Sequence, residues 1–208
     1  MSDSSRFASA RYIAFEGVEG AGKSTIARLV AERLEERGDS VVLVREPGGT
    51  EVGEKIRDVL LTMDHDVDPR AEAALFAASR AQLMAEVVRP ALEAGSWVLS
   101  DRTAYSSLAY QAGGRRLLMD EVFELNDIAL GGLWPDAVVL LRIDSSSGLQ
   151  RQRDGDRIGN EADEFHERVA AAFDVLAGGE PERFVVVDAS LGIDEVVEAV
   201  IDGLGISA

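Results

Sequence analysis

Near its N-terminus the chain reads Gly17-Val18-Glu19-Gly20-Ala21-Gly22-Lys23-Ser24-Thr25, and this segment is the most informative one about the fold. The pattern G-x-x-x-x-G-K-S is typical of a loop that binds phosphate, because its glycines let consecutive backbone N–H groups turn toward an anion. Lys23 adds a positive charge near the outer phosphates, and the Ser24 hydroxyl is an expected ligand of Mg²⁺. The loop therefore predicts nucleotide binding, but alone it does not choose among kinases, GTPases and motor ATPases.

The segments on either side of the loop support this interpretation. An apolar strand, residues 12–15, precedes it, and apolar residues at positions 26, 29, 30 and 34 repeat at a helical spacing after it. The helix that begins at Lys23 turns the positive end of its dipole toward the bound anion. A glycine-rich turn that merely contains a lysine would not need this strand–loop–helix order.

The rest of the chain alternates between strand and helix patterns, which predicts a three-layer α/β architecture with a mostly parallel, five-stranded sheet. At 208 residues, a single domain over 1–208 is the simplest organisation, with residues 1–11 as a Ser-rich flexible tail. Strands are expected at 12–15, 41–44, 97–100, 137–143 and 184–187. Helices are expected at 23–37, 52–61, 69–94 with a possible kink at Pro90, 120–130, 146–153, 164–176 and 193–204. The apolar run at 41–44 suggests a strand buried on both faces.

Composition limits the partners and the location of the protein. A net charge of −17 should repel nucleic acid and anionic lipid, so no nucleic-acid or membrane partner is expected. The chain has no cysteine and no long apolar run, which is compatible with a cytoplasmic protein. Lysine occurs only at positions 23 and 55. This halophilic-like acidic surface is expected of adaptation to concentrated salt, although an ordinary acidic protein is the alternative.

Two further segments carry candidate binding residues. Arg45 and the turn Glu46-Pro47-Gly48-Gly49-Thr50 follow a strand, at the edge of the sheet where such folds bind ligands. They could hold a second phosphate, or they could be a tight turn with a surface arginine. Phe76 and Arg80 are spaced i,i+4 on one helical face, so a ring could stack on a base beside a guanidinium. Taken alone, a core phenylalanine and a solvated arginine explain this pair better.

Asp101 and Arg102 end another strand. An aspartate at such a strand end can hold Mg²⁺ through water, and the arginine can pair with a phosphate, although Asp101 could also cap a helix. Polar residues follow at Ser106, Ser107, Tyr110 and Gln111. The Gln111 amide both donates and accepts hydrogen bonds, as recognition of a pyrimidine edge requires.

Arginines also mark a polar, glycine-containing segment at about 150–163. Arg151, Arg153 and Arg157 could belong to a lid that closes over a transferring phosphoryl group and excludes water. A solvated loop with scattered charges is the alternative.

Together these motifs, in this order, resemble the thymidylate kinase family over about residues 11–200. The resemblance rests on Phe15 to Thr25, Arg45 to Thr50, Asp101-Arg102 with Ser106 to Gln111, and Asp156-Arg157. It implies a P-loop nucleoside-monophosphate-kinase-like fold with an Arg-bearing lid. It also implies transfer of the γ-phosphoryl group of ATP to dTMP with Mg²⁺, usually by a homodimer.

The resemblance assigns roles to individual residues. Residues 17–25, including Val18, Glu19, Ala21 and Thr25, would bind ATP, with Ser24 and Asp101 serving the metal. For dTMP, Arg45 and Arg102 would hold the phosphate, and Glu19 and Tyr110 would lie beside the sugar. Phe76, Arg80, Ser107 and Gln111 would contact the base. Catalysis would fall to Lys23, Arg102 and the lid residues Arg153 and Arg157.

Some positions depart from the family pattern, namely Arg142, Gly159, Ala170 and a short segment before Asp156. They leave open which lid arginine is catalytic. A kinase for another (deoxy)nucleoside monophosphate or for a deoxynucleoside is the main alternative, because it would share the phosphate loop and the lid. An inactive nucleotide-binding switch is a second alternative, suggested by the departures in the lid.

Overall fold

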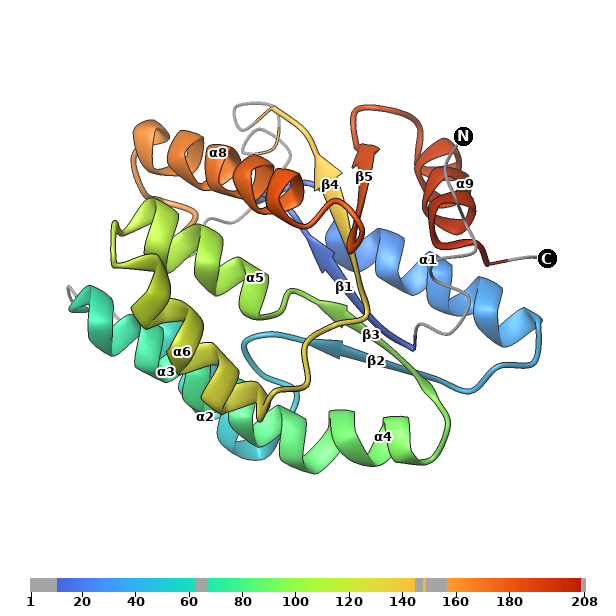
Figure 1. Cartoon of the computed structure of the whole chain (residues 1–208), viewed down its shortest axis with the longest axis horizontal. Coiled ribbons are helices and arrows are strands. Elements are labelled where there is room, and N and C mark those ends of the chain that lie inside the picture. Colours follow the sequence, from blue (N-terminus) through green and yellow to red (C-terminus); the bar gives the residue numbers. More distant parts are fainter. Residues whose placement is uncertain (1–10, 63–66, 145–147, 149–156, 207–208) are drawn as a thin grey trace.

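Five parallel strands form the centre of the structure, in the order β2-β3-β1-β4-β5 (Figure 1). The computed structural model describes residues 11–62, 67–144, 148 and 157–206. The strands are β1 Tyr12–Glu16, β2 Val41–Arg45, β3 Trp97–Asp101, β4 Ala137–Arg142 and β5 Phe184–Asp188. This confirms the predicted α/β fold with five strands, and every pairing is parallel.

Helices cover both faces of the sheet. Figure 1 shows α1 and α9 on one side, and α5, α6 and α8 on the other. The α-helices are α1 Lys23–Glu36, α2 Glu51–Thr62, α3 Pro69–Leu83, α4 Arg89–Glu93, α5 Ala104–Ser107, α6 Met119–Leu130, α8 Asp163–Gly179 and α9 Ile193–Leu204. Two π-helical segments, η2 Met84–Val88 and η3 Leu108–Gly114, follow α3 and α5. None of the helices in the described ranges has the length and apolar character needed to span a membrane.

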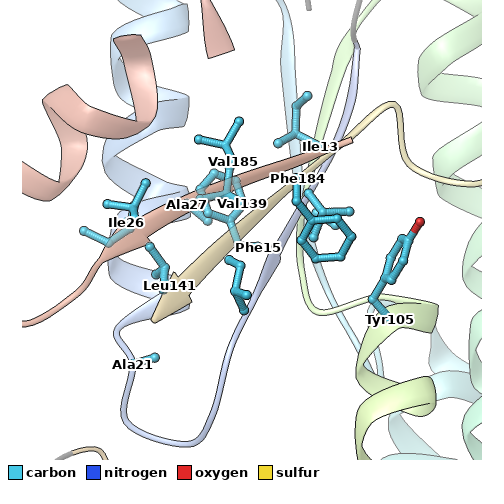
Figure 2. Packing of buried hydrophobic residues seen from close by; sticks show 14 of the residues in the cluster. Ile13, Phe15, Ala21, Ile26, Ala27, Tyr105, Val139, Leu141, Phe184 and Val185 are labelled. Carbon is cyan, nitrogen blue, oxygen red and sulfur yellow. The ribbon is translucent and has the colours of Figure 1, made fainter. Parts of the chain in front are cut away.

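The core forms where the apolar stripe of α1 meets the central strands. Ile26 and Ala27 of α1 belong to the same buried cluster as Leu141 of β4 (Figure 2). On the other side, the ring of Tyr105 meets that of Phe184 edge to face at 5.1 Å between centroids. Since β1 is buried along its whole length, the loop that follows it starts from a rigid base.

The strand at β2 differs from the sequence prediction. A strand buried on both faces is predicted at 41–44, and this is wrong, because Leu43 is 46% exposed. The physical reason is position: β2 lies at the edge of the sheet and pairs with β3 alone. Apolar composition does not tell an edge strand from a central one.

The predicted helix at 69–94 is interrupted before its proline. The backbone takes the wider π-helical pattern at Met84–Val88, and α4 then begins at Arg89. Pro90 lacks an N–H and cannot donate to the carbonyl of the preceding turn, so the hydrogen-bond ladder is rearranged there. The irregular turn therefore comes just before Pro90, and the kink expected at Pro90 stays a prediction.

Several expected segments fall outside the described ranges. They are the tail at 1–10, most of the helix at 146–153, and residues 150–156 of the lid. Arg11, which the sequence analysis includes in the flexible tail, is instead attached to the sheet. Its backbone N–H donates to Asp136 Oδ2 at 2.9 Å, immediately before β4.

Glu16, the last residue of β1, fastens the phosphate loop to the segment that follows β3. Its carboxylate is completely buried and accepts from the backbone N–H and hydroxyl of Thr103, at 2.7 and 2.8 Å. It also accepts from the backbone N–H of Ser106 at 3.2 Å and from the Ser106 hydroxyl. Burial raises the pKa of Glu16, and the hydrogen bonds from Ser106 and Thr103 act in the opposite direction. The start of α5 is therefore held by a side chain from β1.

We expect Glu16→Ala to lower the free energy of unfolding by about 3 kcal/mol, because buried donors on Thr103 and Ser106 lose their acceptor. Urea unfolding measures this loss. The control is Glu36→Ala at an exposed position at the end of α1, which should change stability by less than about 0.5 kcal/mol. Equal effects of the two substitutions would contradict the role of Glu16.

Candidate active site

A cleft of about 430 Å³ opens at the carboxyl ends of β1, β2 and β3. This is the edge at which open parallel sheets bind their ligands. Its wall brings together most of the residues predicted from the sequence: Glu19, Gly20, Gly22, Lys23, Ser24, Thr25, Arg45, Phe76, Asp101, Arg102, Ser107, Tyr110 and Gln111. The phosphate loop and the residues predicted to bind the second substrate thus line one cavity.

The backbone of the phosphate loop requires glycine at specific positions. Gly20 has a φ of +72°, and a Cβ there would lie 1.9 Å from the carbonyl oxygen of Gly148. Gly17 has a φ of +141°, and its Cβ would lie 2.5 Å from the carbonyl oxygen of Leu141. Both the left-handed conformation and the close packing exclude a side chain, so the loop pattern in the sequence is a direct consequence of this turn.

Lys23 is folded back onto the loop. Its Nζ donates to the carbonyl oxygens of Val18 at 2.8 Å and Gly17 at 3.2 Å, and the residue is buried. Burial lowers the pKa of Lys23 to about 8, with Arg102 acting in the same direction and Glu19 opposing it. The ammonium is therefore held at the loop, with a pKa closer to neutral pH than that of an ordinary lysine.

Arg102 links the phosphate loop to the opposite wall. Its guanidinium pairs with the carboxylate of Glu19 and donates to Gly17 O at 3.3 Å. It also donates to Ser106 Oγ at 3.1 Å and lies over the ring of Tyr110, 5.0 Å from its centroid. The backbone φ of Arg102 is +72°, a conformation that costs energy for a residue with a side chain and is concentrated at functional sites.

The pairing of Glu19 with Arg102 sets the charge at the centre of the cleft. Burial would raise the pKa of Glu19, but Arg102 and Lys23 lower it on balance, so this carboxylate is ionised. The pKa of Arg102 is raised by Glu19, Tyr110 and Asp101, although burial opposes them. The arrangement keeps a permanent cation beside the phosphate loop in a protein whose net charge is strongly negative.

Ser24 and Asp101 are suited to a magnesium ion that is also bound by phosphate. The Ser24 hydroxyl donates to Asp101 Oδ2, and both residues line the cleft. Among the described residues, no group of three or more His, Cys, Asp or Glu side chains could hold a metal ion alone. Mg²⁺ in nucleotide sites needs only one or two protein oxygens, with water and phosphate completing its shell, and this pair fits that requirement. Asp101 does not cap α5, because the residue before that helix is Thr103.

Arg45 and Arg80, two of the predicted binding residues, differ in how deeply their side chains are buried. Arg45 lines the cleft and is exposed, with its Nη2 2.9 Å from Glu54 Oε2. Arg80 is only 1% exposed, and its Nε lies 2.7 Å from Glu46 Oε2. It also donates to Ser107 Oγ at 3.2 Å. Arg80 is therefore not the solvated residue of the simpler interpretation, and its contact with a base stays a prediction.

Arg157, which belongs to the predicted lid, contacts α2 and α3. Its Nη2 donates to Glu72 Oε2 at 2.6 Å, and its Nε donates to the carbonyl oxygen of Leu60 at 2.8 Å. It is not among the residues that line the cleft. Arg153 lies outside the described residues, so its predicted catalytic role stays a prediction, as does that of Arg157.

The sequence did not single out two residues that the structure places at or behind the cleft. Arg57 lines the cleft and donates to Pro47 O at 2.8 Å, and Glu72 is a buried carboxylate at the start of α3. Arg57 could have been found from helical spacing, because it lies four residues after Gly53 and three before Leu60, the two buried positions of α2. No sequence signal marks Glu72, since an acidic residue in the first turn of a helix is usually exposed.

Comparison with known proteins identifies the relatives of this chain. A family model described as thymidylate kinase matches residues 15–200. A thymidylate kinase of Pelobacter propionicus is 44% identical, with 91% of each chain covered. One of Clavibacter michiganensis is 47% identical, covering 91% of this chain and 92% of the relative. A crystal structure of thymidylate kinase from Ehrlichia chaffeensis superposes with a TM-score of 0.80 at 30% identity, covering 94% of this chain and 98% of that chain.

We expect the affinity for ATP to fall as the pH rises through about 8, where unliganded Lys23 loses its proton. If bound phosphates keep the lysine charged, Kd at pH 9 should be about 10-fold weaker than at pH 7. Titration with a fluorescent ATP analogue at both pH values measures this ratio. Lys23→Arg keeps its charge and should flatten the dependence. Equal affinities of the wild type at the two pH values would contradict this interpretation.

Proposed function

Because the chain belongs to the thymidylate kinase family, we propose that it transfers the γ-phosphoryl group of ATP to dTMP, giving ADP and dTDP. The observation that supports this most directly is the shared cleft. Lys23 of the phosphate loop and Arg102 of the opposite wall line the same cavity as Phe76 and Gln111. Two nucleotides bound there would meet at their phosphates.

The reaction needs positioning and charge stabilisation more than covalent help. An oxygen of the dTMP phosphate attacks the γ-phosphorus, the bond to the β–γ bridging oxygen breaks, and ADP leaves with that electron pair. A phosphate oxygen is already a competent nucleophile, so a strong general base is not required. Lys23 would hold the ATP phosphates, and Arg102 would stabilise the charge that develops between the two nucleotides.

Magnesium is expected to accompany ATP, with Ser24 and Asp101 as its protein partners. When bound, it would neutralise phosphate charge. Arg45 and Arg57 would hold the dTMP phosphate from the side of β2 and α2, while Phe76 supports the base from α3. The pair of Glu19 with Arg102 would lie between the acceptor sugar and the phosphates.

Two further properties are proposed. A homodimer is usual among thymidylate kinases, and several apolar side chains of α6 are solvent-exposed in one copy, including Phe123 at 46% and Ile128 at 79%. Light scattering after size exclusion would give the mass in solution. A cytoplasmic location is the second proposal, and it rests on the family alone.

Lys23→Ala and Arg102→Ala should each reduce phosphoryl transfer by at least about 100-fold, the effect of losing one electrostatic stabiliser. Coupled measurement of ADP release with dTMP as acceptor checks this. The chain offers matched controls: Lys55→Ala removes the only other lysine, which is exposed and paired with Glu51, and Arg33→Ala removes an exposed partner of Glu198. Wild-type turnover in either site variant would contradict the assigned roles.

Arg153→Ala should also reduce kcat by about 100-fold, because we assign the lid charge to this residue. Arg157, which donates to Glu72, is the comparison. A normal kcat in Arg153→Ala together with a collapsed kcat in Arg157→Ala would reverse the assignment.

The substrate class is tested by a panel of acceptors. ADP release should be fastest with dTMP among dTMP, dUMP, dCMP, dGMP and thymidine, and the series should be repeated across salt concentrations. A preference for another acceptor would favour the alternative kinase activities. ATP binding without acceptor-dependent ADP release would favour a nucleotide-binding switch.

A further inference from the structure

Glu72 gathers donors from two segments that the sequence separates widely. It lies in the first turn of α3 and is only 1% exposed. Its Oε1 accepts from Gln111 Nε2 at 3.0 Å and Arg115 Nε at 3.1 Å. Its Oε2 accepts from Arg115 Nη2 at 3.1 Å and Arg157 Nη2 at 2.6 Å. One buried carboxylate thus connects α3, η3 and the described end of the lid.

The surrounding cations keep this carboxylate ionised. Burial alone would raise the pKa of Glu72, but hydrogen bonds from Arg115, Gln111 and Arg157 lower it on balance. An ionised carboxylate has no proton to donate, so each of its hydrogen-bonding partners must be a donor. The guanidinium groups of Arg115 and Arg157 carry donors only and meet this requirement in any orientation, whereas an amide has one donating end and one accepting end.

The amide of Gln111 is the group whose orientation Glu72 decides. If the amide were reversed, its oxygen would face the carboxylate, and two acceptors would repel each other in a buried site. The amide nitrogen must therefore be the atom that faces the Glu72 carboxylate and donates to it. Because oxygen and nitrogen share one carbon, holding the nitrogen also determines the direction of the carbonyl oxygen. Gln111 lines the cleft, so this choice decides what the wall offers to a base.

We propose that Glu72 is a positioning residue that presents the carbonyl oxygen of Gln111 to the nucleobase, so that the site prefers a base carrying an N3–H. Thymine and uracil carry that hydrogen, whereas the N3 of neutral cytosine is an acceptor and would face the Gln111 oxygen. This inference rests on the proposed function and adds a residue that does not itself line the cleft.

A base without an N3–H would leave the Gln111 carbonyl oxygen without a hydrogen-bond donor, and this affects substrate specificity. A site arranged to accept a hydrogen bond from its substrate strongly rejects an analogue that lacks the hydrogen, because the buried acceptor is left without a partner. Methyl groups contribute much less to such discrimination. Glu72 should therefore affect the choice between dTMP and dCMP more than the choice between dTMP and dUMP.

Glu72→Gln provides the direct test. The new amide can accept or donate, so the Gln111 amide is no longer held in one orientation. We expect the ratio of kcat/KM for dTMP to kcat/KM for dCMP to fall by at least about 10-fold. Both acceptors are measured on one preparation, so the fraction of folded enzyme cancels from the ratio. Glu72→Asp keeps the charge opposite Arg115 and Arg157 but withdraws the carboxylate by one methylene, and it should lower the ratio in the same direction.

The matched control is Glu161→Gln. Glu161 pairs with the same arginine, with its Oε1 2.6 Å from Arg115 Nη1, and its side chain is 29% exposed. Removing this charge leaves the partner of the Gln111 amide unchanged, so the selectivity ratio should stay at the wild-type value. An unchanged ratio in folded Glu72→Gln and Glu72→Asp, with only stability or overall activity reduced, would overturn the inference. A wild type without dTMP-dependent ADP release would instead overturn the proposed function, and the inference with it.

Discussion

The site depends on the hydrogen bonds that Glu16 accepts at the end of β1. The phosphate loop starts at the next residue, and the buried Glu16 carboxylate holds Thr103 and Ser106 at the start of α5. The same strand therefore carries the loop and holds α5, which joins the two walls of the cleft. Arg102 lies between these fixed points, and its unfavourable backbone conformation is maintained by the contacts on both sides.

Charge is the second constraint, because a strongly acidic protein must build a site for polyanions. The cations at the cleft are each held by specific partners: Lys23 by carbonyl oxygens of the loop, Arg102 by Glu19, and Arg45 by Glu54. Burial of Arg80 with Glu46, and of Glu72 with Arg115 and Arg157, places further pairs behind the wall. Buried pairs of this kind contribute little to stability by themselves, but they restrict the positions of the groups around them.

Much of the fold could be predicted because it follows from local chemistry. The phosphate loop needs residues without side chains, and the positive φ values of Gly17 and Gly20 show why the pattern is so specific. Strand and helix boundaries follow the spacing of apolar residues. The exposed edge position of Leu43 and the π-helical turn before Pro90 could not be predicted in the same way, since they depend on neighbours in space and on how a broken hydrogen-bond ladder is repaired.

The phosphate loop, the alternation of strands and helices, and the resemblance to one kinase family are all encoded in neighbouring or regularly spaced residues, so they can be read from the chain without a structure. The burial of Arg80 against Glu46, the contact of Arg157 with Glu72 and the hydrogen bond from the Gln111 amide to Glu72 are visible only in the folded protein. These contacts join residues that are far apart in the chain. The free energy of each contact depends on how deeply its groups are buried, which cannot be read from neighbouring residues.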